Sequence, residues 1–213
     1  MATILLHGLG QGPESWEAVA RGLEGEVLCP DLFAPVRGGT AAYPGIYRAF
    51  AGFCRGLGGP LRLCGLSLGG VLALQYAAEH PERVEALALV GTPYVMPKGL
   101  LRFQNAVFRL LPGGAFRQMG LSKRDVMGLT RSMMDLDFRE ELRKISCPVL
   151  VLCGERDRAN RKAALGLQRA LSRAELAWIP QAGHEANTDA PDALAEALRR
   201  FFRARGRSCG SGL

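Results

Sequence analysis

Six short apolar runs alternate with helical patterns along most of this chain, and this alternation constrains the fold more than any other feature. The runs are rich in Leu, Val and Ile, as is typical of strands buried on both faces of a parallel sheet. The expected strands are Thr3–Leu6, Glu26–Cys29, Leu61–Cys64, Ala86–Val90, Val149–Cys153 and Leu176–Ile179. The expected helices are Pro13–Leu23, Tyr43–Arg55, Leu68–Glu79, Arg161–Leu171 and Pro191–Phe202. The pattern predicts an α/β fold with an open, mainly parallel six-stranded sheet flanked by helices.

One segment interrupts the alternation. Between Val90 and Val149 the sequence shows helical patterning but no convincing strand, with apolar residues at helical spacing at Leu100, Phe103, Val107 and Leu110. An insertion of this size between two strands favours a helical cap over one edge of the sheet. We therefore expect a core formed by residues 1–92 and 147–205, a helical cap subdomain at 93–146, and a flexible tail at 206–213.

Composition narrows the class of protein. Of the 213 residues, 48% are hydrophobic and 22% are charged, as in soluble globular proteins. No apolar run approaches the ~20 residues that a membrane-spanning helix needs. Met1 leads directly into the first apolar run, so we expect no signal peptide and a cytoplasmic location. The six cysteines form no C-x-x-C pair and no metal-ligand spacing, which predicts reduced thiols, no metal and no cofactor.

The net charge of +7 is placed unevenly. Most of the excess falls between Pro93 and Ser146, and a further group of arginines lies near the C-terminus. The aromatic residues do not interleave with the basic ones as nucleic-acid stacking platforms would. We therefore expect neither a nucleic-acid nor a membrane partner, and the sequence does not indicate an oligomeric state.

The segment from Leu63 to His80 carries a G-x-S-x-G sequence between an expected strand and an expected helix. In that context the central serine, Ser67, occupies a tight strand-to-helix turn and projects from the end of the sheet. Gly65 and Gly69 stand two residues to either side, where a side chain would collide with the turn. The helix N-terminus places partial positive charge near the hydroxyl. The simpler alternative is an ordinary helix N-cap serine.

A serine nucleophile needs a base, and the chain has three histidines. His80 precedes Pro81 at a helix end and is expected to be a surface cap. His7 follows the first strand and is expected to be structural rather than catalytic. His184 lies in a loop after the last strand and is the candidate base, although a solvated loop histidine is the alternative.

The base in turn needs an orienting acid. Asp157 follows the fifth expected strand and is the candidate, with Glu155 and Asp189 as competing acids and a plain helix cap as the alternative role. The ends of parallel strands meet at one edge of a sheet, so Ser67, Asp157 and His184 are expected to converge there.

With these residues the chain closely resembles the α/β-hydrolase superfamily, specifically a small, single-domain, serine esterase-like member with a helical cap. The resemblance covers nearly the whole chain and rests on His7-Gly8, the Ser67 motif, the segment ending at Asp157 and Gly183-His184. The chain starts at the family's HG strand, so the resemblance implies a sheet that lacks the first two strands of the usual fold. It also departs from the family's D-x-P-G-x-G loop after the second strand.

The resemblance implies a Ser67–His184–Asp157 triad and an oxyanion hole formed by the backbone N–H groups of Leu9 and Leu68. It implies hydrolysis of carboxylic esters through an acyl-enzyme. The same scaffold supports C–C bond hydrolases, thioesterases, and cofactor-free lyases or haloperoxidase-like enzymes. A non-catalytic ligand receptor with the hydrolase fold is the alternative outside enzymes.

The expected cap is rich in methionine and phenylalanine, which form adaptable apolar surfaces. The residues considered for a substrate pocket are Tyr94, Met96, Phe103, Met127 and Met134. They would suit an ester with an apolar acyl chain or an aromatic ring, but they could equally form the core of the cap. The cap arginines could attract an anionic group, including a carrier-protein-bound substrate, or could form a solvated basic face.

Overall fold

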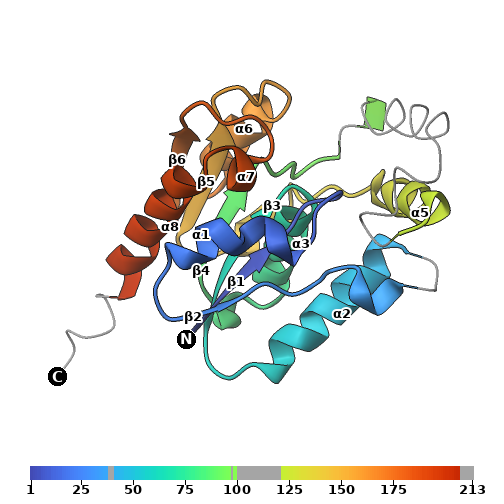
Figure 1. The fold of residues 1–213 in the computed structure, drawn as a ribbon, viewed down its shortest axis with the longest axis horizontal. Coiled ribbons are helices and arrows are strands. Elements are labelled where there is room, and N and C mark those ends of the chain that lie inside the picture. Colours follow the sequence, from blue (N-terminus) through green and yellow to red (C-terminus); the bar gives the residue numbers. More distant parts are fainter. Residues whose placement is uncertain (38–40, 97, 100–120, 207–213) are drawn as a thin grey trace.

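The computed structural model describes residues 1–37, 41–96, 98–99 and 121–206 and contains one six-stranded sheet (Figure 1). All neighbouring strands pair in parallel, in the order β2-β1-β3-β4-β5-β6. The strands are β1 (Ala2–Leu6), β2 (Glu26–Leu28), β3 (Leu61–Leu66), β4 (Val84–Val90), β5 (Val149–Gly154) and β6 (Ala174–Ile179). This confirms the predicted open, parallel α/β sheet.

Helices cover both faces of the sheet, as the alternation of strands and helices requires (Figure 1). One face carries α1 (Glu17–Arg21), α7 (Ala186–Asp189) and α8 (Pro191–Gly206). The other carries α2 (Tyr43–Gly56), α3 (Leu68–Glu79) and α6 (Arg161–Ala170). Among the described residues, the other elements are α5 (Lys123–Met133) and the short 3-10 helices η1 (Pro13–Trp16), η2 (Ala34–Val36), η3 (Pro81–Arg83) and η5 (Glu141–Lys144).

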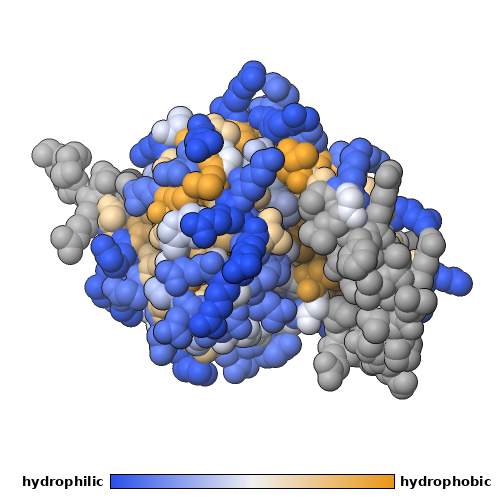
Figure 2. All heavy atoms as spheres, turned by 90° about the horizontal axis from the view of Figure 1, so that it is seen from above, coloured by the Kyte–Doolittle hydropathy of each residue, from blue (hydrophilic) through white to orange (hydrophobic). Residues whose placement is uncertain are grey.

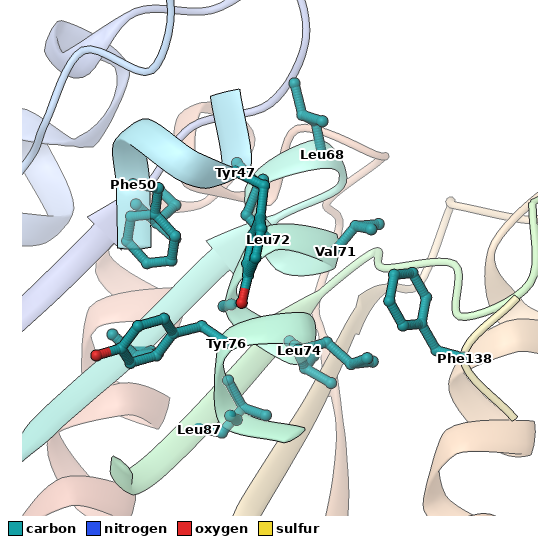
Figure 3. Packing of buried hydrophobic residues seen from close by; sticks show 14 of the residues in the cluster. Tyr47, Phe50, Leu68, Val71, Leu72, Leu74, Tyr76, Leu87 and Phe138 are labelled. Carbon is teal, nitrogen blue, oxygen red and sulfur yellow. The ribbon is translucent and has the colours of Figure 1, made fainter. Parts of the chain in front are cut away.

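The strands are apolar on both faces because each face is covered. In β5, Val149, Val151 and Cys153 pack toward α3 and α6, whereas Leu150 and Leu152 pack toward α8. Figure 3 shows the larger of the two cores, in which side chains of α2, α3, β4 and the segment at Phe138 meet. Burial of apolar surface contributes roughly 25 cal/mol per Å² to the stability of the fold. The loops at the carboxyl ends of the strands are therefore attached to a stable, well-packed sheet.

Boundaries differ from the sequence expectation at a few places. Pro13–Leu23 does not form one helix, because η1 precedes α1. The carbonyl oxygen of Gly12 accepts hydrogen bonds from both the N–H and the Oγ of Ser15, at 3.2 and 2.7 Å, and these i,i+3 bonds favour the tighter 3-10 turn. The strands β4 and β6 each begin two residues earlier than expected, and β2 ends at Leu28.

In the expected cap, α5 begins with a capping box between Ser122 and Asp125. The helix lies beside the start of α2 (Figure 1). Its buried side chains belong to the same core as those of α2, and the Tyr43 N–H donates to Ser132 Oγ at 2.9 Å. An isolated antiparallel bridge joins Val95 and Asp137. The predicted helical spacing of Leu100, Phe103, Val107 and Leu110 lies outside the described residues, so a separate cap subdomain stays a prediction.

The face in Figure 2 is mostly polar, with scattered apolar patches. Among the described residues, no helix combines the length and the apolar character needed to cross a bilayer. The five described cysteines are free thiols, in agreement with the predicted reduced state, and all are buried except the half-buried Cys29. His80 caps the C-terminus of α3, where its ring lies against that of Tyr76.

Candidate active site

The predicted catalytic residues all lie just beyond the carboxyl ends of strands, at one edge of the sheet (Figure 1). Ser67 separates β3 from α3, Asp157 follows β5, and His184 follows β6. The loop that contains His7 and Leu9 follows β1. This is the edge at which open α/β sheets bind their ligands.

Ser67 occupies the tight turn that the sequence predicted. Its backbone has φ 50° and ψ −111°, an unusual conformation for a non-glycine residue. The Ser67 N–H donates to the carbonyl oxygen of Val90 at 2.9 Å, and its own carbonyl accepts from the N–H of Val71 at 3.0 Å. The side chain does not cap α3, and the residue is half-buried. The simple N-cap alternative is therefore wrong.

The two glycines of the motif are required by close backbone contacts. A Cβ at Gly65 would overlap the backbone of Gly69 and Gly70, and a Cβ at Gly69 would overlap the carbonyl of Leu6 in β1. The first collision lies within the turn, as the sequence indicated. The second involves the neighbouring strand, which the local sequence did not reveal. The backbone at Gly65 and Gly69 is therefore closely packed within the turn and against β1, and this packing fixes the position of Ser67.

Asp157 and His184 form a hydrogen-bonded pair. The distance between Asp157 Oδ2 and His184 Nδ1 is 2.8 Å. The Asp157 side chain is only 4% exposed, whereas that of His184 is 41% exposed. Burial raises the pKa of Asp157, but hydrogen bonds from His184 and Asn160 outweigh it and hold the pKa below its usual value. An ionised Asp157 thus accepts the Nδ1–H of His184 and leaves Nε2 available as a base.

Asn160 is a further member of this cluster that the sequence analysis did not identify. Its Nδ2 donates to both carboxylate oxygens of Asp157, at 3.0 and 2.9 Å, and lies 3.1 Å from His184 Nδ1. Its backbone N–H also reaches Asp157 Oδ1, at 3.2 Å. The only sequence signal is an Asp-x-x-Asn spacing, which is common in turns and helix starts.

The competing acids, Glu155 and Asp189, bind the backbone of the His184 loop and not its imidazole. Glu155 Oε2 accepts from the N–H of Gln181 at 3.1 Å, and Asp189 Oδ2 accepts from the N–H of Gly183 at 2.7 Å. Two backbone bonds also join the Asp157 loop to the His184 loop, from Glu155 N–H to Ile179 O and from Arg156 N–H to Ala182 O. These contacts explain why Asp157, rather than its neighbours, meets the ring.

The end of β4 lies next to both Ser67 and the hydrogen-bonded Asp157–His184 pair. Val90 accepts the Ser67 N–H, and the next residue, Gly91, lies against the pair: a Cβ there would be 3.0 Å from His184 Nδ1 and 3.2 Å from Asp157 Oδ2. Within the described part of the chain, no hydrogen bond links the Ser67 hydroxyl to His184. Catalytic hydrogen bonds are often long in ligand-free sites and tighten when substrate binds.

His7 is fully buried and structural in its contacts. Its Nδ1 lies 3.0 Å from the Gly8 carbonyl oxygen, and the Leu32 N–H donates to its Nε2 at 3.1 Å. Burial lowers the pKa of His7, opposed by the bond to Gly8 and by the charge of Asp31. A neutral ring can make both bonds at once, so His7 ties the loop after β1 to the loop after β2.

The two predicted oxyanion-hole groups stand at the same edge. Leu68 is the first residue of α3 and Leu9 lies in the loop after β1. Among the described residues, neither backbone N–H has a protein acceptor. Unsatisfied N–H groups at a helix N-terminus and in a nearby loop can donate to an anionic oxygen.

The predicted pocket residues have mixed environments. Met96 is buried in the core, and Tyr94 is half-buried with its hydroxyl close to Gly166 of α6. Met127 and Met134 are half-buried on and just beyond α5. Phe103 lies outside the described residues. A substrate pocket formed by these residues therefore stays a prediction.

No group of three or more metal-binding side chains occurs in the described ranges. The site combines a half-buried serine, a buried carboxylate and a solvent-accessible imidazole, which together suit acid–base and nucleophilic chemistry.

Comparison with known proteins identifies the family. Residues 3–197 match the model of the alpha/beta hydrolase family, and the chain belongs to that family. It is 37% identical over 90 residues to the pimeloyl-[acyl-carrier protein] methyl ester esterase of Aromatoleum aromaticum, a match that covers 42% of this chain and 36% of that protein. The protein of the same name from Nitrosomonas europaea is 24% identical over 220 residues, covering 85% of this chain and 87% of the relative.

Solved structures agree with the family assignment. A thermophilic esterase from Thermogutta terrifontis superposes with a TM-score of 0.79 and 25% identity, covering 96% of this chain and 90% of that structure. The predicted resemblance to the α/β-hydrolase superfamily is therefore confirmed, and so, at the level of class, is the expectation of an esterase-like hydrolase.

Proposed function

We propose that this protein is a serine hydrolase that cleaves carboxylic esters through Ser67, His184 and Asp157. The observation that carries the proposal is the 2.8 Å hydrogen bond between Asp157 and His184. This pair lies beside the end of β4, and the strained Ser67 is hydrogen-bonded to the same strand end. A buried, ionised carboxylate next to an accessible imidazole is the arrangement that activates a serine. An ordinary capping serine would not need this setting.

In the proposed reaction, His184 Nε2 removes the hydroxyl proton of Ser67, and Ser67 Oγ forms a bond to the ester carbonyl carbon. Asp157 holds Nδ1–H and stabilises the imidazolium. The tetrahedral intermediate then breaks its bond to the leaving alcohol, which takes the proton from His184. Water, deprotonated by the same imidazole, then attacks the acyl carbon of the acyl-enzyme. The second tetrahedral intermediate breaks its bond to Ser67 Oγ, which takes the proton back from His184, and the carboxylic acid is released.

The negative oxygen of the intermediate would be bound by the N–H groups of Leu9 and Leu68. Their lack of protein acceptors in the described structure supports this role. Each such donor contributes about 3 kcal/mol to transition-state stabilisation. Asn160 would keep the Asp157 carboxylate in place through its two side-chain hydrogen bonds.

A carrier-protein-bound ester is a second candidate substrate. The two relatives described above are named as esterases of an acyl-carrier-protein methyl ester, and most of the basic excess of this chain falls between residues 93 and 146. Arg124 and Arg131 are exposed on α5, where they could attract an acidic partner. A small ester with an apolar acyl chain remains the first candidate, because it needs no partner surface.

A substrate panel tests the proposal and its alternatives together. Purified protein is assayed with p-nitrophenyl esters of increasing chain length, an acyl thioester, a β-diketone, and a methyl ester in free and carrier-bound form. The proposal predicts ester turnover that is lost in Ser67→Ala. Turnover of only the thioester or the diketone would favour the corresponding alternative, and failure of a serine-directed phosphonate to react would favour a ligand receptor.

The carrier-bound candidate has its own control. Charge reversal at Arg124 and Arg131 should raise KM for the carrier-bound methyl ester several-fold and leave KM for the free methyl ester unchanged. An equal change for both esters would exclude recognition of the carrier by these two residues.

A further inference from the structure

We propose that the buried side-chain amides of Gln11 and Asn187 are a positioning pair that holds the loop of Leu9 in register with the loop of His184. This inference rests on the proposed function, because it assigns the pair to transition-state stabilisation at the same site. Neither side chain is assigned a contact with substrate.

The pair is reciprocal. Gln11 Nε2 donates to Asn187 Oδ1 at 3.2 Å, and Asn187 Nδ2 donates to Gln11 Oε1 at 3.1 Å. Gln11 is 9% exposed and Asn187 is 1% exposed. The partners lie 176 positions apart in the sequence, one after β1 and the other in α7. Two buried amides that satisfy each other form a neutral, directional link between the loops.

On one side, Gln11 fixes the turn that contains Leu9. Its N–H donates to the Gly8 carbonyl at 3.3 Å, and its Oε1 accepts from the Gly8 N–H at 3.4 Å. These two bonds close the four residues from Gly8 to Gln11 into one turn. The Leu9 N–H, which has no protein acceptor among the described residues, is carried on this turn.

On the other side, Asn187 lies three residues after His184, within the short helix α7. Its Nδ2 also donates to the carbonyl oxygen of Ser15, at 3.2 Å. The Ser15 hydroxyl oxygen, whose proton is donated to the Gly12 carbonyl, lies 3.3 Å from Gln11 Oε1. The amide pair and Ser15 thus join three segments: the loop after β1, η1 and the start of α7.

Backbone groups determine which way the two amides face. The Gly8 N–H can only donate, so the Gln11 oxygen must face it. The Ser15 carbonyl can only accept, so the Asn187 nitrogen must face it. With both orientations fixed, each amide presents the complementary group to its partner, and a substitution on either side leaves buried polar atoms unpaired.

The distances explain why such a link matters for rate. An oxyanion donor must stand 2.7–3.1 Å from the oxygen of the transition state, and a displacement of about 1 Å can cost roughly 10²-fold in rate. Ser67 and Leu68 are fixed by β3 and α3, whereas Leu9 and His184 come from separate loops. The Gln11–Asn187 pair provides a buried side-chain link between those two loops.

A double-mutant cycle tests the inference in the intact protein. Gln11→Met keeps the length of the side chain, Asn187→Ala removes its partner, and the double variant removes both. For each protein, reactive sites are counted with a serine-directed phosphonate, and kcat per reactive site and KM are measured on a p-nitrophenyl ester. Each single variant should lose roughly 10- to 100-fold in kcat per site, with KM changed less than about three-fold.

Coupling and a matched control separate positioning from stability. The double variant should lose no more kcat per site than the worse single variant, because both remove the same link. Tyr43→Phe, which removes a 2.7 Å bond to Gln75 between α2 and α3, should keep the wild-type kcat per site. Normal kcat per site in Gln11→Met and Asn187→Ala, with only fewer reactive sites, would mean a merely structural role and would overturn the inference.

Results that contradict the proposed ester hydrolysis can be distinguished from results that contradict only the positioning role. A wild-type protein that neither hydrolyses the ester nor reacts with the phosphonate would remove the proposed function, and with it this inference. An active wild type whose Gln11 and Asn187 variants match it per site would remove only the positioning role.

Discussion

The serine turn and the acid–base loops share one edge of the sheet but are held by different forces. Ser67 is fixed by backbone packing, since Gly65 and Gly69 leave no room for a side chain and the Ser67 N–H is bound to β4. Asp157 and His184 are fixed by polar side-chain contacts, chiefly with each other and with Asn160. His184 is also exposed, whereas Ser67 is half-buried and its neighbours Leu66 and Leu68 are buried.

This difference predicts two kinds of response to mutation. A larger side chain in the serine turn should lower the stability of the fold, because the surrounding backbone cannot shift to accommodate it without a large cost in free energy. Removing a polar contact from the acid–base loops should act on rate and on pH dependence, because the sheet beneath them stays intact. We expect the largest effect from removal of the proposed nucleophile itself.

Ser67→Ala should lower kcat by about 10⁶-fold and leave the unfolding temperature within a few degrees of the wild type. The substitution removes the nucleophile and adds no atoms to the crowded turn. Steady-state ester hydrolysis and thermal unfolding measure the two quantities. Residual activity above a few per cent would show that another group performs the reaction.

Asp157→Asn should lower kcat by about 10⁴-fold, because an amide can favour the wrong imidazole tautomer and cannot stabilise the imidazolium. Glu155→Gln is the matched control, since Glu155 binds the backbone of the loop and not the ring. It should lose less than about ten-fold. A larger loss in Glu155→Gln than in Asp157→Asn would reverse the assignment of the acid.

Gly69→Ala should destabilise the fold by about 1–3 kcal/mol or prevent folding, because the new methyl group would overlap the carbonyl of Leu6. Gly56→Ala is the control, since a Cβ at that end of α2 would meet no atom within 4 Å. It should be neutral or slightly stabilising. Urea denaturation gives the free energy of unfolding of each variant. Equal values for the two variants would contradict the claim that backbone packing fixes the serine turn.

Asn160→Ala should give the smallest change, about ten-fold in kcat, together with weaker acid resistance. The pKa of Asp157 is lowered in the folded state, so its ionised form stabilises the fold above the unfolded pKa of about 3.9. That contribution disappears as the pH falls through the lower, folded value. Without Asn160 the pKa should rise toward its ordinary value and the contribution should shrink.

The free energy of unfolding, measured between pH 6 and pH 2, tests whether the contribution of Asp157 to stability is lost on acidification. The stability difference between the wild type and Asn160→Ala should be largest near neutral pH and should narrow as the pH falls below about 4. A difference that stays constant across the range would mean that Asn160 acts only through packing.

The sheet, the tight turn at Ser67 and the proximity of Asp157 and His184 could be predicted from the sequence because each has a local signal. Continuous apolar runs mark strands buried on both faces, and the candidate catalytic residues follow directly after such runs. The same reasoning failed at Pro13–Leu23, where the Ser15 bonds to Gly12 tighten the first turn without changing the apolar periodicity.

Other features near these residues have no distinctive local signal. The Gln11–Asn187 pair joins positions that are distant in the chain, and neither residue belongs to a periodic pattern. Asn160 is visible only once the fold brings Asp157 and His184 together. The collision of Gly69 with β1 likewise depends on how neighbouring strands pack, and not on the turn itself.

The most direct test of the central claim is to map the residue that reacts with a serine-directed phosphonate. Wild-type protein and Ser67→Ala are labelled, digested and analysed by mass spectrometry. The proposed mechanism predicts one adduct, on Ser67, with labelling slowed strongly in Asp157→Asn and absent in Ser67→Ala. An adduct on another residue, or labelling of Ser67→Ala at the wild-type rate, would contradict it.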